Sequence, residues 1–195
     1  MAPFLNALLS LFLSCVLFVA ASEAARETDS YDGNIFPIYA GNGSLVPPQS
    51  TLSASLENQR TSVITFYLDD SATSKAFAPV ISGLKLLWGT SIDLIPITTD
   101  ELQGKMEKDP TKEGYYWHGQ IPQVVVINGV GEVTLDQEGQ VPIESINKAI
   151  SIATGLDEPS YKIEIKSFND YNSEPSIEGY TDTRENKQAQ TKRIK

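Results

Sequence analysis

The stretch SVITFYLDDSATSKAFAPV, residues 62–80, decides the fold. It opens with β-branched and aromatic residues, which are typical of a buried strand, and a strand is predicted over residues 62–68. After a polar turn, apolar residues recur at steps of three and four, which predicts an amphipathic helix over residues 74–88. Gly89 follows at the position where glycine commonly ends a helix. The stretch therefore predicts a strand that leads directly into a long helix.

Outward from this stretch, strand and helix patterns alternate along the chain. Before this stretch, the sequence predicts a short strand at Ile35–Tyr39 and a helix at 51–59. The strand is placed at an edge of the sheet because Pro37 is tolerated only there. After the stretch, the sequence predicts strands at 92–97, 123–127 and 132–135, helices at 98–108 and 141–154, and a loop at 111–119. The order β–α–β–α–β–α–β–β–α predicts an α/β fold with a central mixed sheet flanked by helices.

The composition excludes several classes of function. The chain has 195 residues and a formal charge of −10, with no basic stripe, so nucleic-acid binding is not expected. The single cysteine, Cys15, excludes disulfide frameworks and cysteine metal clusters within one chain. Cys15 is interpreted as apolar filler, with lipid attachment as the alternative. The single histidine, His118, has no nucleophile or metal cluster to serve, so a structural or surface role is expected.

The first 24 residues are predicted to be a signal peptide or a membrane anchor. Residues 5–21 are almost continuously apolar, close to the lower limit for crossing a bilayer. Small residues follow at the spacing that signal peptidase requires, although the usual basic residues are missing. Cleavage and retention both remain open, and in either case the rest of the chain is expected to be exported.

The remaining chain is predicted to have three parts. Residues 25–60 form an N-terminal extension with the edge strand and the first helix, and residues 61–158 form the core. Residues 159–195 form a polar tail, in which residues 161–165 alternate like one extra strand. From about Ser167 the composition predicts disorder.

Three local patterns resemble the thioredoxin superfamily. In that family a strand ends in an aromatic residue and is followed by Cys-x-x-Cys-Lys at a helix start. Here Ser71 and Ser74 occupy the cysteine positions, Lys75 follows, and Ala78-Pro79 matches the family's Ala-Pro pair. Ile121-Pro122 precedes an apolar strand, where the family has a cis proline facing the dithiol. Gly131-Glu132-Val133 matches the family's hairpin, and the resemblance implies a thioredoxin-like fold.

Departures from the family pattern predict that dithiol exchange is lost. A thiolate is needed to attack a disulfide, and a serine hydroxyl cannot replace it. Thr65 stands where the family has a buried carboxylate, and Asp70 where it has tryptophan. Ser71 and Ser74 are therefore interpreted as helix-capping residues, and no catalytic residue, metal ligand or cofactor is predicted.

A protein without this chemistry can still bind partners. The resemblance implies that the cis proline, Pro122, exposes a strand-like backbone edge for an extended peptide. The residues predicted to line the surface around it are Tyr67, Tyr115, Tyr116, Trp117 and Ile121. Packing of the loop aromatics over the edge of the domain is the equally weighted alternative.

The serine-substituted site, the Tyr-Leu-Asp-Asp turn, the segment at residues 119–126 and the apolar leader together are similar to a narrower group. These are the cyanobacterial thylakoid proteins of thioredoxin-like fold associated with accumulation of photosystem I. The resemblance implies an assembly factor in the thylakoid lumen or on the thylakoid membrane, with the periplasm as the alternative compartment. Its partners would be subunits or assembly factors of a membrane complex, not a small-molecule substrate. A general peptide-binding holdase and a residual redox enzyme stay as alternatives.

Overall fold

The computed structural model describes residues 26–100, 102, 104 and 106–159, together with the backbone of two short strands in the tail. The predicted leader, residues 1–24, lies outside the described residues. Within the described part, no helix has both the length and the apolar character needed to cross a bilayer.

A four-stranded mixed sheet forms the centre of the fold, in the order β2-β1-β3-β4. Its strands are β1 (Ser62–Tyr67), β2 (Asp93–Thr98), β3 (Gln123–Ile127) and β4 (Val133–Glu138). β1 pairs with β2 in parallel and with β3 antiparallel, and β3 pairs antiparallel with β4. Every residue of β1 and β3 is buried, because both strands have neighbours on each side and helices over the sheet.

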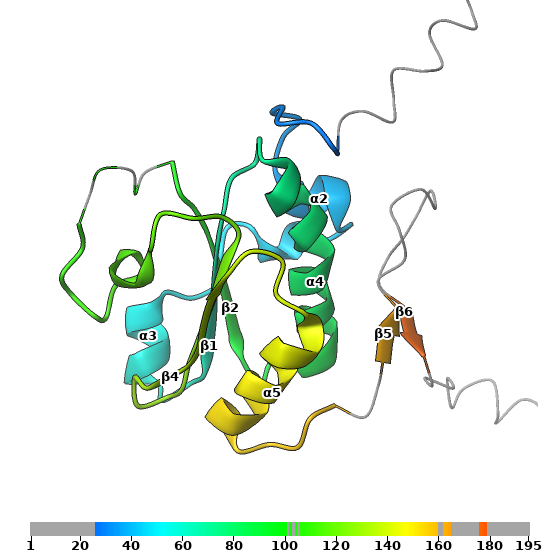
Figure 1. Cartoon of the computed structure of the whole chain (residues 1–195). Coiled ribbons are helices and arrows are strands. Elements are labelled where there is room, and N and C mark those ends of the chain that lie inside the picture. Colours follow the sequence, from blue (N-terminus) through cyan, green and yellow to red (C-terminus); the bar gives the residue numbers. More distant parts are fainter. Residues whose placement is uncertain are drawn as a thin grey trace, which may run out of the picture.

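Helices cover both faces of this sheet (Figure 1). On one face lie α2 (Ile35–Tyr39), α4 (Ala72–Trp88) and α5 (Ile143–Thr154). On the other face lie α3 (Leu52–Glu57) and the short 3₁₀ helix η3 (Glu113–Tyr116). A second 3₁₀ helix, η2 (Gly43–Leu45), contacts β2. The predicted mixed sheet flanked by helices is confirmed.

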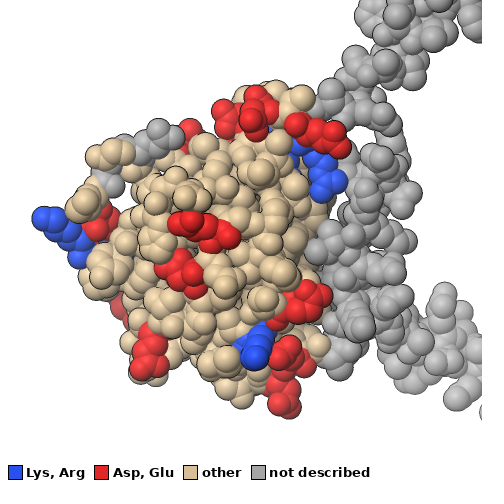
Figure 2. All heavy atoms as spheres, viewed as in Figure 1, with Lys and Arg blue, Asp and Glu red and all other residues tan. Residues whose placement is uncertain are grey.

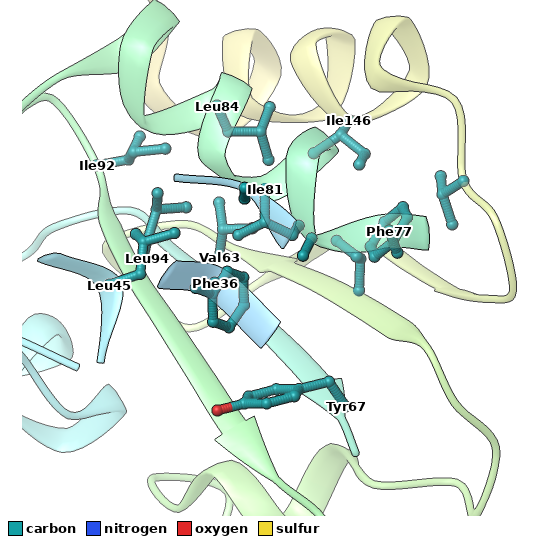
Figure 3. Close-up of a cluster of buried hydrophobic side chains, with 14 of the residues drawn as sticks. Phe36, Leu45, Val63, Tyr67, Phe77, Ile81, Leu84, Ile92, Leu94 and Ile146 are labelled. Atoms are coloured by element: carbon teal, nitrogen blue, oxygen red, sulfur yellow. The ribbon is translucent and has the colours of Figure 1, made fainter. Parts of the chain in front are cut away.

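The larger hydrophobic cluster lies between the sheet and the face covered by α4 and α5. In Figure 3, Leu84 of α4 and Ile146 of α5 lie in the cluster that covers Val63 of β1. All three side chains are fully buried. The spacing of apolar residues that predicted these two helices therefore corresponds to their buried faces.

The segment Ile35–Tyr39 is the helix α2, so the predicted edge strand is wrong. The Asn34 side chain accepts a hydrogen bond from the Phe36 amide and caps the helix. Pro37 lies in the first turn, where its missing N–H costs nothing. Ile35, Phe36 and Tyr39 are buried and α2 packs on α4, so tertiary packing selects the helix.

The predicted helix at residues 98–108 is also wrong. β2 continues to Thr98, and the described residues that follow are in turns and irregular structure. Leu102 packs against the core, but Met106 is 87% exposed, so the segment has no continuous apolar face to bury. The side chain of Glu107 instead accepts hydrogen bonds from the backbone amides of Lys108 and Asp109.

The predicted hairpin between β3 and β4 is confirmed. The Asn128 side chain accepts hydrogen bonds from the amides of Val130 and Glu132, which closes the turn. β4 extends three residues beyond the predicted end, to Glu138. The helix α5 ends at Gly155, which adopts the left-handed conformation that glycine permits.

Two short antiparallel strands lie in the tail, β5 (Lys162–Glu164) and β6 (Ser176–Glu178). The extra strand predicted over residues 161–165 is confirmed at Lys162–Glu164. The prediction of disorder from Ser167 onward is wrong for Ser176–Glu178, because pairing with β5 satisfies backbone groups of both segments. The rest of the predicted disordered tail lies outside the described residues.

Candidate functional site

The two serines lie where β1 leads into α4; Ser71 caps the helix, whereas Ser74 bonds to the loop that precedes it. Ser71 is the N-cap of α4, and its hydroxyl accepts a hydrogen bond from the Ser74 amide at 3.4 Å. The buried Ser74 hydroxyl accepts one from the Leu68 amide at 3.2 Å. Within the described part of the chain, neither hydroxyl is hydrogen-bonded to a side chain that could serve as a base. The interpretation as a helix-capping residue is therefore confirmed for Ser71. It is wrong for Ser74, whose hydroxyl accepts from a loop amide outside the helix.

Pro122 lies beside the carboxyl end of β1, because the next residue, Gln123, is paired with Phe66. The peptide bond between Ile121 and Pro122 is cis, as the resemblance implied. The Pro122 carbonyl accepts a hydrogen bond from the Gly139 amide at 2.7 Å. This contact joins the start of β3 to the end of β4 next to the beginning of α4.

Part of the predicted N-terminal extension covers the beginning of α4. We call residues 26–34 the N-terminal strap. The carboxylate of Asp29 in this strap accepts a hydrogen bond from the Ala72 amide at 2.9 Å. An acidic side chain is stabilising at a helix N-terminus, where amide groups have no partners inside the helix.

Lys75, which follows the second serine, fastens the strap to the domain. Its side chain is 0% exposed, and its Nζ lies 2.6 Å from a carboxylate oxygen of Asp32. The same ammonium donates to the backbone carbonyls of Thr28 at 3.1 Å and Ser30 at 2.6 Å, and it lies 5.4 Å from the centre of the Tyr39 ring. The Lys75 hydrogen bond lowers the pKa of Asp32. The strap thus supplies the carboxylate and carbonyl oxygens that a buried ammonium group needs as partners.

Tyr67 is buried beneath the same region, so the expectation that it lines an open surface is wrong. Its hydroxyl accepts a hydrogen bond from the Asn34 side chain at 3.0 Å, and burial raises the pKa of Tyr67 to about 12. The Asp69 carboxylate accepts from the Ile35 amide at 2.9 Å. Burial, opposed by that hydrogen bond, raises the pKa of Asp69.

The strap residues Asp29, Asp32 and Asn34 were not predicted to belong to the site. The only sequence signal was a group of polar residues just before an apolar segment, which is common in exposed turns. The corresponding partners lie about 40 positions further along the chain, and no short-range pattern indicates such a pairing.

The aromatic loop divides into buried and exposed rings. Tyr116 is buried and donates a hydrogen bond to the Pro110 carbonyl. The prediction that it lines an open surface is therefore wrong. The Trp117 ring packs on Phe66 at 5.3 Å and is half-buried, as is Ile121. Tyr115 is 48% exposed and packs edge-on against Tyr116. Of the predicted partner-binding tyrosines, Tyr115 is therefore the one that solvent reaches.

A polar cluster lies at the end of β4. The buried Gln123 donates to the Asp136 carboxylate at 2.8 Å and accepts from the His118 amide at 3.1 Å. The half-exposed His118 ring lies 3.4 Å from Asp136 and 3.7 Å from Glu138. His118, Asp136 and Glu138 border an open hollow of about 580 Å³, which Val141 and Pro142 also line. Among the described residues, no group of side chains has the arrangement needed to hold a metal ion.

The chemistry available at the beginning of α4 follows from these contacts. A thiolate attacks disulfides, and Ser71 and Ser74 instead present hydroxyls that are engaged with the backbone. Thr65 adds no ionisable group, because an aliphatic hydroxyl does not titrate, and among the described residues this buried hydroxyl has no hydrogen-bond partner. The arrangement is suited to holding the N-terminal strap against the domain.

No protein-family model matches the chain. A search of curated proteins finds a protein named thylakoid membrane protein slr1796, from Synechocystis sp., that is 35% identical over 153 residues. The alignment covers 77% of this chain and 76% of that protein.

Proposed function

Because the chain belongs to the family of the Synechocystis thylakoid membrane protein slr1796, we propose that it is a thylakoid-associated binding protein. In this proposal it has a thioredoxin-like fold without dithiol chemistry, and it supports the assembly or accumulation of a thylakoid membrane complex. Photosystem I is the proposed complex, on the basis of the resemblance described above. The relative's name supports the thylakoid location, whereas the identity of the complex rests on the resemblance.

The observation that carries the proposal is the state of the beginning of α4. Ser71 and Ser74 stand where a thioredoxin would have its two thiols; the Ser71 hydroxyl caps the helix and the Ser74 hydroxyl accepts from the Leu68 amide. Asp29 of the strap occupies the adjacent helix N-terminus through the Ala72 amide. A helix N-terminus that is capped and covered in this way favours a role in binding over a role in disulfide exchange.

The order of elements supports the thioredoxin-like part of the proposal. A parallel β1–β2 pair linked by the long helix α4, followed by an antiparallel β3–β4 hairpin and a final helix, matches what the resemblance implied. The cis bond before Pro122 lies next to the carboxyl end of β1, as in that superfamily. These matches do not identify a partner, since one fold serves many functions.

The test is complementation of a deletion strain combined with capture from native thylakoid membranes. Deletion is expected to lower the amount of photosystem I, and the captured material is expected to contain its subunits or assembly factors. A chain with Ser71→Ala and Ser74→Ala should restore the complex fully, because both hydroxyls only bind backbone amides. Loss of the Ser71 cap and of the buried Ser74 hydrogen bond should each cost about 1 kcal/mol of stability.

Three outcomes would contradict the proposal. One is a normal level of photosystem I in the deletion strain. Another is disulfide reductase activity in the purified wild-type chain that the two serine substitutions abolish. The third is capture of many unrelated unfolded polypeptides in place of one complex, which would support a general holdase.

A further inference from the structure

Among the described residues, the outer edge of β4 has no strand partner. β4 is the last strand of the sheet order, and within this part of the chain it pairs with β3 alone. Among the described residues, no hydrogen bond reaches the outward backbone groups of Val133–Glu138. Exposed edges of this kind pair readily with another extended chain.

The register shows which backbone groups point outward. The Gly139 amide donates to the carbonyl of Pro122, which lies directly opposite it, so this is a hydrogen-bonded pair of the ladder. In an antiparallel ladder such pairs alternate with pairs that are not hydrogen-bonded. The amide and carbonyl groups of Gln137 therefore point toward β3, whereas those of Asp136 and Glu138 point outward. Asp136 and Glu138, on either side of Gln137, thus offer two outward-facing residues, which are enough to begin pairing with an added strand.

The charge of this edge selects the partner. Residues 119–147 contain Glu132, Asp136, Glu138 and Glu144 and no Lys or Arg. On the face shown in Figure 2, the charged side chains are mostly acidic. The hollow beside the edge is lined by His118, Asp136 and Glu138 together with uncharged residues. An incoming segment with Lys or Arg side chains would meet carboxylates there, and an acidic segment would be repelled.

The site is also fixed in position before any partner binds. The buried Gln123 holds the Asp136 carboxylate at 2.8 Å and the His118 amide at 3.1 Å. The Gln140 side chain donates to the Thr73 carbonyl at 2.7 Å, which anchors the loop after β4 to α4. Pre-positioned groups lower the entropic cost of binding.

We propose that the outer edge of β4 and the adjoining hollow bind a basic, extended segment of a partner protein, which adds to the sheet as a further strand. This inference rests on the proposed function, because it assigns the surface through which the binding protein would act. The segment forms main-chain hydrogen bonds with Asp136 and Glu138, and its basic side chains lie against the acidic wall of the hollow.

The test uses the purified full-length chain and two capped synthetic peptides, one of alternating Lys and Val and one of alternating Glu and Val. The basic peptide is expected to bind, more weakly as salt is raised, and to slow hydrogen exchange at the amides of Asp136 and Glu138. Equal binding of the acidic peptide, or protection at other amides only, would overturn the proposal. Protection of these two amides without any peptide would mean that the chain itself already covers the edge, and would overturn it as well.

A matched pair of variants separates backbone pairing from charge. Glu138→Pro removes the outward amide and the charge without touching the ladder to β3, and Glu138→Gln removes only the charge. The expected losses of affinity for the basic peptide are about tenfold for Glu138→Pro and about threefold for Glu138→Gln. Equal affinities for both variants would exclude strand addition. Unfolding curves of each variant verify that the fold is kept, and the exchange experiment on the wild-type chain does not depend on them.

The membrane capture described above distinguishes failure of this inference from failure of the proposed function. If Glu138→Pro captures photosystem I subunits as well as the wild-type chain does, the edge is not the docking surface and the proposed function stands. If the wild-type chain captures none of them but still binds the basic peptide, the proposed function fails and the peptide site stands.

Discussion

Replacing Lys75 with Met should release the N-terminal strap from the body of the protein. Methionine keeps most of the length and the apolar character of the side chain but removes the ammonium. The substitution therefore deletes the ion pair with Asp32 and the hydrogen bonds to the carbonyls of Thr28 and Ser30. The apolar core next to it should stay filled.

The size of the effect follows from the burial of the two charges. Removing one partner of a fully buried ion pair costs about 3–5 kcal/mol, because the other charge is left without compensation. The Asp32 side chain is 29% exposed, so water can solvate its carboxylate once Lys75 is gone. We therefore expect a loss of about 2–3 kcal/mol, which corresponds to a fall in Tm of about 5–10 °C for a chain of this size.

Urea unfolding followed by circular dichroism measures this loss, and Lys148→Met is the matched control. Lys148 is an exposed lysine on α5, so its replacement should change the free energy of unfolding by less than about 0.5 kcal/mol. Hydrogen exchange supplies a local readout. The amides of Ala72 and Ile35, which donate to Asp29 and Asp69, should exchange faster in Lys75→Met.

Two results would refute this reasoning. The first is a Lys75→Met variant as stable as the Lys148→Met control. The second is a loss of stability with no acceleration of exchange at Ala72 and Ile35, which would mean that Lys75 stabilises the core without holding the strap.

Two further substitutions test other contacts. Gly129→Ala would push a methyl group into the backbone carbonyl of Gln59, and urea unfolding should show a loss of about 1–3 kcal/mol. Gly43→Ala is the control and should be nearly neutral, because its methyl group would meet the Pro37 Cβ at 3.8 Å, an ordinary contact. Burial raises the pKa of Asp93, but hydrogen bonds, the strongest from Arg60, outweigh this and hold the pKa below its usual range. The wild-type chain should therefore have a larger free energy of unfolding than Asp93→Asn at neutral pH, and this difference should shrink as the pH falls below about 4. A difference that does not depend on pH would contradict this.

The elements predicted correctly are those with a clear apolar pattern. β1 and β3 are buried on both faces and appear in the sequence as continuous apolar runs. α4 and α5 carry apolar residues at helical spacing because one face of each packs on the sheet. In such segments the local pattern and the tertiary packing agree.

The wrong predictions are those in which distant contacts decide the structure. Pro37 indicated an edge strand, yet burial of Ile35 and Phe36 against α4 selects a helix. The strap lacks any periodicity, and the partner of Asp32 is 43 positions away. The burial of Tyr67 follows from Asn34 and α2, neither of which a strand pattern can indicate.

The capping role of Ser71 could be predicted, because capping depends on residues within one turn of the helix, whereas the hydrogen bond of Ser74 to the Leu68 amide could not. Their coverage by the strap could not be predicted. The polar cluster around Gln123 was missed for the same reason, since Gln123 was assigned only to a strand and His118 only to a loop.

The absence of basic residues from positions 119–147 has a consequence for orientation at a lipid bilayer. Bilayers that contain anionic lipids have a negative surface potential, which acts over about 8–10 Å at physiological ionic strength. A protein held at such a distance experiences a torque, because its acidic side is repelled by the headgroups. That torque rotates the β4 side away from the headgroups and toward the aqueous phase.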